Sequence, residues 1–144
     1  MKNTIMKFSP VANSLKLIGG KWKIMILDNL LSKSMRFGRL KRSLNGITSQ
    51  MLSKQLKQME IDKLINKKIS KSENLNTEYS LTEFGKSTAP IVKSLIIWGS
   101  FNKRKITKII DEDELVFSES SFLQDRVIDL FHDEIRLKNL QRKK

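Results

Sequence analysis

The 144-residue sequence contains no cysteine and a single histidine, His132. Without thiols the chain can form neither a disulfide nor a cysteine nucleophile, and it lacks the Cys/His set of a zinc site. Gly-rich phosphate loops and nucleophile elbows are also missing. We therefore predict that the protein is not an enzyme and uses no metal and no cofactor. His132, with no second ligand nearby in the sequence, is interpreted as a surface or interface residue.

Long apolar runs are absent as well. No stretch approaches the roughly 20 apolar residues that span a bilayer, and residues 1–8 contain no apolar signal core. We therefore expect a cytoplasmic protein with no membrane partner. The chain has one Tyr, and its two Trp residues fall on apolar stripes, so the exposed aromatic platforms of single-strand-binding proteins are not expected.

Positive charge is abundant. The chain has 28 Lys and Arg against 15 Asp and Glu, a formal net charge of +13, which favours a polyanionic partner. Residues 21–71 hold 13 Lys and Arg against 3 Asp and Glu, a net +10 within about a third of the chain. The apolar content of 39% suits one domain of ordinary size with helical appendages.

Three short helices are predicted in the first half of the chain. Ser9-Pro10 is a typical helix start, and this helix should end at Gly19-Gly20. A second helix from Lys21 to about Leu31 carries a buried stripe of Trp22, Met25, Ile26 and Leu30. Residues 35–37 are predicted as a short strand, and a third helix over 38–44 supplies Leu40 and Leu44 to the core.

Asn45-Gly46 is a strong turn signal, after which Thr48 should cap a fourth helix. Its apolar positions, predicted to face inward, are Met51, Leu52, Leu56 and Met59. The opposite face carries hydrogen-bonding groups and no carboxylate, namely Ser49, Gln50, Ser53, Lys54 and Lys57. Because this helix follows a short helix and a tight turn, we interpret it as the recognition helix of a helix-turn-helix.

From Leu64 the pattern alternates with period two and returns at Tyr79 and Leu81, which predicts a β-hairpin wing with a polar tip over residues 71–77. Thr82 should cap a helix with an apolar stripe from Phe84 to Trp98, kinked at Pro90. A further wide stripe predicts a helix over 121–140, and the acidic residues 111–114 are predicted to form a solvated linker. The fold class is therefore mainly α with a small β-hairpin.

We expect a winged helix-turn-helix domain over residues 9–100, with N- and C-terminal dimerisation helices. Residues 101–144 would form a C-terminal helical extension associated with the dimer. A long apolar stripe outside a small core often pairs with a second subunit. The residues assigned to this dimer interface are Val11, Leu15, Leu95, Trp98 and Phe101. Trp98 and Phe101 are alternatively the lining of a pocket for a small-molecule effector that the sequence does not identify.

Several motifs in this order resemble the HxlR-type transcriptional regulators over roughly residues 9–100. They are Leu17-Ile-Gly-Gly-Lys-Trp22, Arg36-Phe-Gly38, Leu40, Gly46-Ile47, Leu52-Ser53 and Tyr79-Ser-Leu-Thr82 with Gly85. The resemblance implies a homodimeric winged-helix DNA-binding protein, related in fold to the MarR-type regulators, whose relatives include both repressors and activators. Several members carry a redox-sensing Cys where this chain has Ser9, so that switch cannot operate here. Many carry a wing Arg where this chain has Asn76, which puts minor-groove insertion in doubt.

The interface with double-stranded DNA is assigned by residue type. Side chains in the major groove read base edges, whereas cations around it hold phosphates. Base readout is assigned to Ser49, Gln50, Ser53 and Lys54. Backbone contacts are assigned to Arg36, Arg39, Lys41, Arg42, Lys57, Lys67, Lys68 and Lys71. Lys54 and Lys57 could each reach a guanine or a phosphate, and Ser49 or Gln50 could be simple capping residues on a solvated face.

The sequence therefore predicts a sequence-specific transcriptional regulator, expected to be a repressor that binds an inverted-repeat operator as a homodimer. The alternative is a non-specific architectural nucleic-acid-binding protein, in which the charge of +13 alone supplies affinity.

Overall fold

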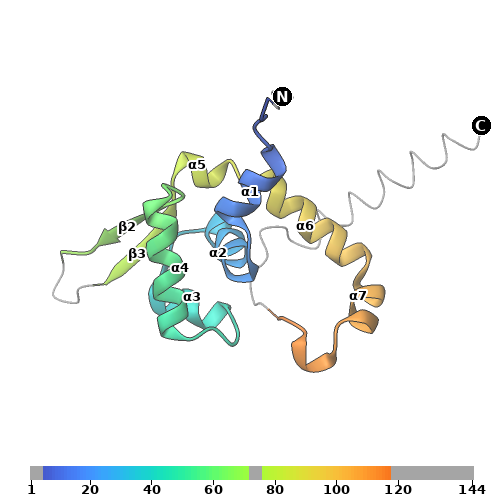
Figure 1. Ribbon diagram of the computed structural model, residues 1–144. Coiled ribbons are helices and arrows are strands. Elements are labelled where there is room, and N and C mark those ends of the chain that lie inside the picture. Colours follow the sequence, from blue (N-terminus) through green and yellow to red (C-terminus); the bar gives the residue numbers. More distant parts are fainter. Residues whose placement is uncertain (1–4, 72–75, 118–144) are drawn as a thin grey trace, which may run out of the picture.

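The computed structural model describes residues 5–71 and 76–117 as a mainly helical fold with one small sheet. Figure 1 shows α4 and the hairpin on one side of α2, and α6 with α7 on the other. The elements are α1 (Pro10–Ile18), α2 (Lys21–Ser32), β1 (Met35–Arg36), α3 (Phe37–Ser43), α4 (Ser49–Ile61), β2 (Ile65–Ile69), β3 (Thr77–Leu81), α5 (Glu83–Lys86), α6 (Ala89–Phe101), α7 (Lys103–Ile109) and the 3₁₀ helix η1 (Glu112–Glu114).

The core lies where α2, α3, α4 and the sheet meet. Ile26 and Leu27 of α2 are fully buried, and the predicted core residues Leu40 and Leu44 are fully buried beside them. Trp22 packs against this cluster at its edge and is half-buried. The predicted order of helices is confirmed, with α3 beginning at Phe37, one residue earlier than expected.

The sheet has three antiparallel strands in the order β1-β3-β2. The hairpin pairs Ile65 with Leu81, and β1 adds to its outer edge by pairing Met35 with Tyr79. Because side chains alternate along a strand, these four residues share the buried face that closes the core. The predicted hairpin is confirmed, and the short strand predicted before α3 completes the sheet.

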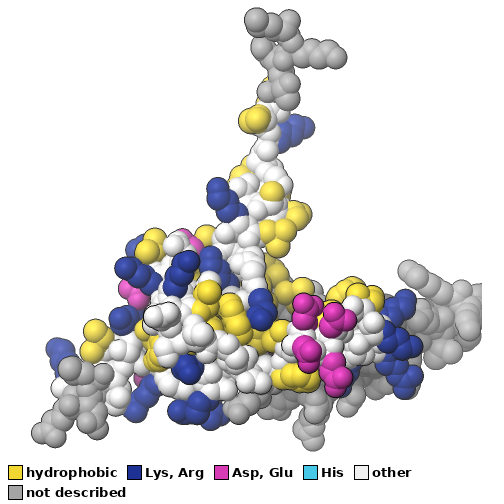
Figure 2. All heavy atoms as spheres, turned by 60° about the horizontal axis from the view of Figure 1, so that its bottom comes forward, with side chains coloured by type: hydrophobic (Ala, Val, Ile, Leu, Met, Phe, Trp, Pro, Cys, Tyr) yellow, Lys and Arg dark blue, Asp and Glu magenta, His cyan; other side chains and the backbone are white. Residues whose placement is uncertain are grey.

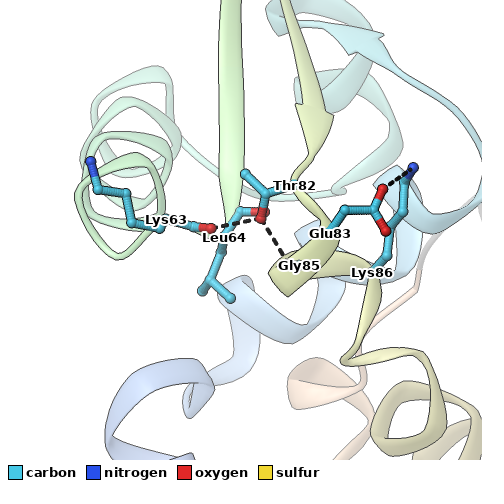
Figure 3. Close-up of polar contacts among 6 residues, drawn as sticks. All are labelled: Lys63, Leu64, Thr82, Glu83, Gly85 and Lys86. Carbon is cyan, nitrogen blue, oxygen red and sulfur yellow. Dashed lines mark hydrogen bonds and ion pairs between the residues drawn. The ribbon is translucent and has the colours of Figure 1, made fainter.

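The two ends of the hairpin are fastened to each other at Thr82 (Figure 3). The Thr82 hydroxyl donates to the carbonyl oxygens of Lys63 and Leu64, at 2.6 and 3.1 Å, and accepts from the Gly85 N–H at 2.9 Å. The Thr82 N–H also donates to the Leu64 carbonyl, at 3.0 Å. One residue therefore caps α5, as predicted, and ties the exit of the wing to its entrance.

The kink predicted at Pro90 is wrong. The helix capped by Thr82 ends after one turn at Lys86, and α6 begins separately at Ala89 with Pro90 in its first turn. Proline costs nothing there, because first-turn N–H groups have no partner within the helix. The Thr88 hydroxyl bonds the Gly85 carbonyl at 2.7 Å and fixes the bend between α5 and α6.

The inward orientation predicted for Met51 is also wrong. Its side chain is 37% exposed, whereas Leu52, Leu56 and Met59 are buried. Helix α4 contacts the core along this one narrow stripe, and Met51 lies about 100° around the helix from Leu52, at the rim of the contact.

Helices α1, α6 and α7 lie mostly outside the core. They bury only Ile18 and Val92 between them. Helix α6 ends at Phe101 and α7 follows after Asn102, so the expected boundary at residue 100 falls within the last turn of α6.

The acidic residues predicted as a linker include the exposed η1. The helix predicted over 121–140 and residues 72–75 of the wing tip lie outside the described residues. Within 5–71 and 76–117, no helix is both long and apolar enough to cross a bilayer.

Candidate nucleic-acid interface

Helix α4 is placed by the turn that precedes it. Gly46 adopts a φ of 90°, a backbone conformation that glycine takes without steric cost. Buried Ile47 anchors the turn in the core, and the Thr48 hydroxyl accepts from the Met51 N–H at 3.1 Å. The chain therefore enters α4 in a fixed direction, with Ser49 and Gln50 exposed at its start.

The outer face of α4 is open to solvent. All five side chains predicted to face outward are exposed: Ser49, Gln50, Ser53, Lys54 and Lys57. Glu60 is also exposed, on the side of α4 nearest the wing, so the carboxylate-free part of this face extends only over the first two and a half turns. The donors that a major groove can bind are concentrated at the start of the helix.

On the wing side of α4 the chain forms a hollow of about 440 Å³, called here the wing-side hollow. Its lining consists of Phe37, Ser53, Lys57, Glu60, Lys67 and Tyr79. Burial, and to a lesser degree the Glu60 carboxylate, raises the pKa of the Tyr79 phenol above 10.0. The phenol therefore stays protonated at neutral pH, and Lys57 and Lys67 are the cations of this hollow.

The outward face of the sheet carries a row of alternating charge. Glu78 of β3 pairs with Arg36 of β1 on one side and with Lys68 of β2 on the other. All three are exposed. A groove of about 600 Å³ continues from this row to α3 and includes Lys33, Arg36, Arg39 and Arg42. Arg36 and Lys68 therefore flank a single carboxylate in an otherwise basic groove.

Two further cations were predicted as backbone contacts. Lys41 of α3 and Lys71 beside the wing tip are exposed. Figure 2, which brings the lower part of Figure 1 forward, shows Lys and Arg side chains spread over the left part of this face. The largest group of acidic side chains lies right of the centre, beside a further group of Lys and Arg side chains, and a few acidic side chains lie among the cations on the left.

A second hollow on the other side of α4 contains two lysines that were not predicted from the sequence as DNA contacts. It measures about 310 Å³ and joins Lys21, Trp22 and Lys23 of α2 to Lys54, Gln55 and Gln58 of α4. We call it the α2-side hollow. The only sequence signal for it was the inclusion of Lys21 and Lys23 in the basic stretch over residues 21–71.

Two helices are linked by a turn, the second helix protrudes, and a basic three-stranded sheet forms the wing. This is the arrangement of winged helix-turn-helix proteins. Comparison with known families agrees with this arrangement. The model of the HxlR-like helix-turn-helix family matches residues 17–107.

The chain belongs to the HxlR-like helix-turn-helix family.

Relatives of this HxlR-like chain are transcriptional regulators. It is 44% identical over 94 residues to the HTH-type transcriptional regulator YdzF of Bacillus subtilis, a match that covers 65% of this chain and 86% of YdzF. The structure of the redox regulator HypR in its reduced form matches with a TM-score of 0.66 at 35% identity, over 69% of this chain and 99% of HypR. A structure described as a MarR-family regulator from Porphyromonas gingivalis W83 matches with a TM-score of 0.62 at 31% identity, over 70% and 99% of the two chains. This HxlR-like chain is therefore a transcriptional regulator with a winged helix-turn-helix DNA-binding fold.

Proposed function

We propose that the protein is a homodimeric transcriptional repressor that binds an inverted-repeat operator in double-stranded DNA. The observation that carries the proposal is the first half of α4, which is exposed and rich in hydrogen-bond donors. It protrudes from the core between the wing-side hollow and the α2-side hollow. In this assignment Ser49, Gln50, Ser53 and Lys54 read base edges. Gln50 suits adenine, whose N6 and N7 atoms match a carboxamide bidentately.

Phosphate contacts are assigned to the cations around that helix. They are Arg36, Arg39, Lys41, Arg42, Lys57, Lys67, Lys68 and Lys71, and every one is exposed. Phosphate contacts set the register of the protein on the duplex without reading sequence. Asn76 is half-buried beside Arg36 and Lys68 in a groove of the wing, so we assign the wing to the backbone rather than to minor-groove bases.

The homodimer is proposed from the apolar residues that this fold leaves exposed. Val11 and Leu15 of α1 are 71% and 62% exposed, and Trp98 of α6 is 63% exposed. Leu95 and Phe101 belong to the same helix and are exposed as well. An apolar surface of this kind is stabilised when a second subunit covers it. We propose that residues 9–100 carry DNA binding and that residues 101–144 contribute to the dimer.

A two-fold dimer would place two copies of α4 in successive major grooves on one side of the duplex, about 34 Å apart. Repression requires only that such a dimer occupy promoter DNA. HypR is described as a redox regulator. Since the chain has no Cys, we propose that its own signal is not read by a thiol within it.

The test begins with selection of bound duplexes from a random-sequence pool at near-physiological salt. We expect enrichment of an inverted repeat with half-sites about one helical turn apart. Retention without enrichment would contradict the proposal and favour a non-specific architectural protein. Placing the selected operator across a promoter should then lower transcript yield in vitro, and a rise would overturn the repressor assignment alone.

Two substitutions separate base readout from backbone binding. Gln50→Ala should relax base preference at one position of each half-site, because alanine cannot form the bidentate hydrogen bonds. Lys68→Ala should weaken binding to all duplexes alike and lower the slope of log affinity against log salt by about 1. Affinities of both variants for the operator and for a scrambled duplex measure this. Equal losses on every sequence from both changes would defeat the assignment.

A further inference from the structure

Helix α4 stands between two hollows. The wing-side hollow contains Lys57 and Lys67, and the α2-side hollow contains Lys21, Lys23 and Lys54. The volumes, about 440 and 310 Å³, are each large enough for a hydrated phosphate group. Figure 1 shows the same arrangement, with the hairpin on one side of α4 and the start of α2 on the other.

A duplex bound to α4 brings a phosphate strand to each side of the helix. The major groove is about 12 Å wide and an α-helix with its side chains about 10 to 12 Å across, so a seated helix nearly fills the groove. The two sugar-phosphate strands that border the groove must then pass over the two flanks of α4. Lys57 and Lys67, which were assigned to phosphates, line the hollow on the wing side of α4. None of the residues assigned to phosphates lines the α2-side hollow, where Lys54 was assigned to base readout.

Lys21 and Lys23 each contact one neighbouring group of the chain. The Lys21 ammonium lies 4.3 Å from the centre of the Trp22 ring. The Lys23 ammonium is 3.5 Å from the Leu17 carbonyl oxygen, which leaves two of its three N–H groups free to donate to a ligand. Neither lysine makes an ion pair with a residue in the described parts of the chain. Both ammonium groups therefore keep N–H donors for a ligand.

We propose that Lys21 and Lys23 bind the DNA phosphate backbone on the flank of α4 opposite the wing. The inference rests on the proposed function and extends it, since it assigns one strand of the major groove to α2 and the other to the wing. Gln55 and Gln58 complete the hollow as neutral side chains, and the Gln58 amide donates to the Asp62 carboxylate at 3.0 Å. Phosphate binding here carries no base preference.

The acidic end of the described chain lies on the other side of Lys21. Asp113 and Glu114 line a hollow of about 510 Å³ together with Lys21, Trp22 and the turn residues Asn45 and Gly46. Two carboxylates in this position repel a phosphate strand and attract the Lys21 ammonium. If Lys21 binds backbone, removing their charge must therefore strengthen DNA binding. A gain of affinity that requires Lys21 is not expected from misfolding.

The loss experiment uses the full chain, the selected operator and a scrambled duplex. Lys21→Gln combined with Lys23→Gln should weaken both duplexes by the same factor and lower the salt slope by about 0.9 for each phosphate that is no longer bound. The affinity ratio between 50 and 200 mM salt should then shrink about 3.5-fold per phosphate. Lys105→Gln with Lys108→Gln removes the same charge from α7, and Lys21→Arg with Lys23→Arg keeps the charge. We expect both control variants to retain the wild-type slope.

The gain experiment uses the acidic residues. Asp113→Asn with Glu114→Gln should raise affinity for both duplexes several-fold at low salt. Asp111→Asn with Glu112→Gln makes the same charge change outside that hollow, and screening over about 8 Å at physiological salt should make its effect smaller. The gain should disappear when Lys21→Gln is added to the Asp113/Glu114 variant.

The outcomes distinguish this inference from the function on which it rests. Failure of the wild-type protein to enrich an operator would refute the proposed function. An enriched operator, together with a Lys21/Lys23 variant whose salt slope falls no further than that of the α7 control, would refute the inference alone. Light scattering and thermal unfolding of each variant confirm that the dimer and the fold are intact.

Discussion

At the scale of single residues, the environment of Tyr79 in the wing-side hollow changes the acidity of its phenol. Tyr79 is the only tyrosine in the chain, and its pKa is raised first by burial and second by the Glu60 carboxylate. Both causes disfavour the phenolate. With the pKa of the folded state above that of the unfolded state, the protonated phenol stabilises the fold below pH 10. This contribution is lost as pH rises from about 10 through the folded-state value.

We predict that titration of the phenolate absorbance in the near ultraviolet gives a midpoint above 10.0 for the folded protein. Glu60→Gln should lower that midpoint only partly, because burial is the larger cause. The urea-unfolded chain, in which the single tyrosine is solvated, is the internal reference. Identical midpoints in the folded and unfolded chains would contradict the prediction.

The sequence correctly predicted which side chains are exposed where the geometry of a single helix determines their exposure. Because α4 packs on a single stripe, periodicity alone identified five exposed polar residues, and it failed only for Met51 at the edge of that stripe. Those exposed residues are Ser49, Gln50, Ser53, Lys54 and Lys57. Lys21 and Lys23 were missed for a different reason. They lie about thirty residues before Lys54, and only the packing of α2 against α4 brings them to the recognition helix. The periodicity of one helix does not indicate how close residues of a different helix lie to it.

At the scale of elements, the junction at Thr82 fixes how the wing joins the helices. The hydroxyl caps α5 and bonds the residues that precede β2, so the hairpin leaves the core at a defined angle. Gly85 allows this approach, because a Cβ there would lie 2.1 Å from the Leu64 carbonyl oxygen. In the same region Pro90 was misinterpreted. Pro90 lacks an N–H, and either a kink within one helix or the start of a new helix can accommodate that absence. The hydrogen bond from the Thr88 hydroxyl to the Gly85 carbonyl favours the new helix start.

Thr82→Val should therefore destabilise the protein by about 1 to 2 kcal/mol, since it keeps the branched shape but removes the cap and the bonds to Lys63 and Leu64. Thr82→Ser keeps the hydroxyl and should cost less. Urea unfolding followed by circular dichroism gives both free energies of unfolding. Equal losses for Val and Ser would show that the hydroxyl does not hold the junction.

At the scale of the whole molecule, burial is unevenly distributed. The helix-turn-helix and the sheet bury their apolar residues, whereas α1 and α6 leave Val11, Leu15, Leu95 and Trp98 between 50% and 71% exposed. The sequence predicted these residues as exposed to a second subunit because their stripe exceeded what a small core can cover. Which surface of the partner they meet depends on the geometry of two chains together, and periodicity within one chain does not determine it.

Leu95→Glu should convert the proposed dimer to a folded monomer, because the side chain is half exposed and its replacement leaves the core intact. Affinity for the inverted repeat should fall much further than affinity for a half-site. Ile69→Glu in β2, where the side chain is 57% exposed, is the matched control and should remain dimeric. Sedimentation velocity at several protein concentrations measures the outcome, and a Leu95→Glu variant that sediments as the wild type does would exclude this face as the interface.

The closure of the hairpin at Leu64 and Thr82 also has a consequence for protein engineering. The wing enters and leaves the core through one pair of bonded residues, so its outer part can change length or sequence without altering the path of α4 or α5 as long as Ile65, Tyr79 and Leu81 stay in the core. Residues 66–78 are thus a natural cassette. Exchanging this cassette between family members should transfer the DNA contacts of the donor's wing onto the recognition helix of the recipient.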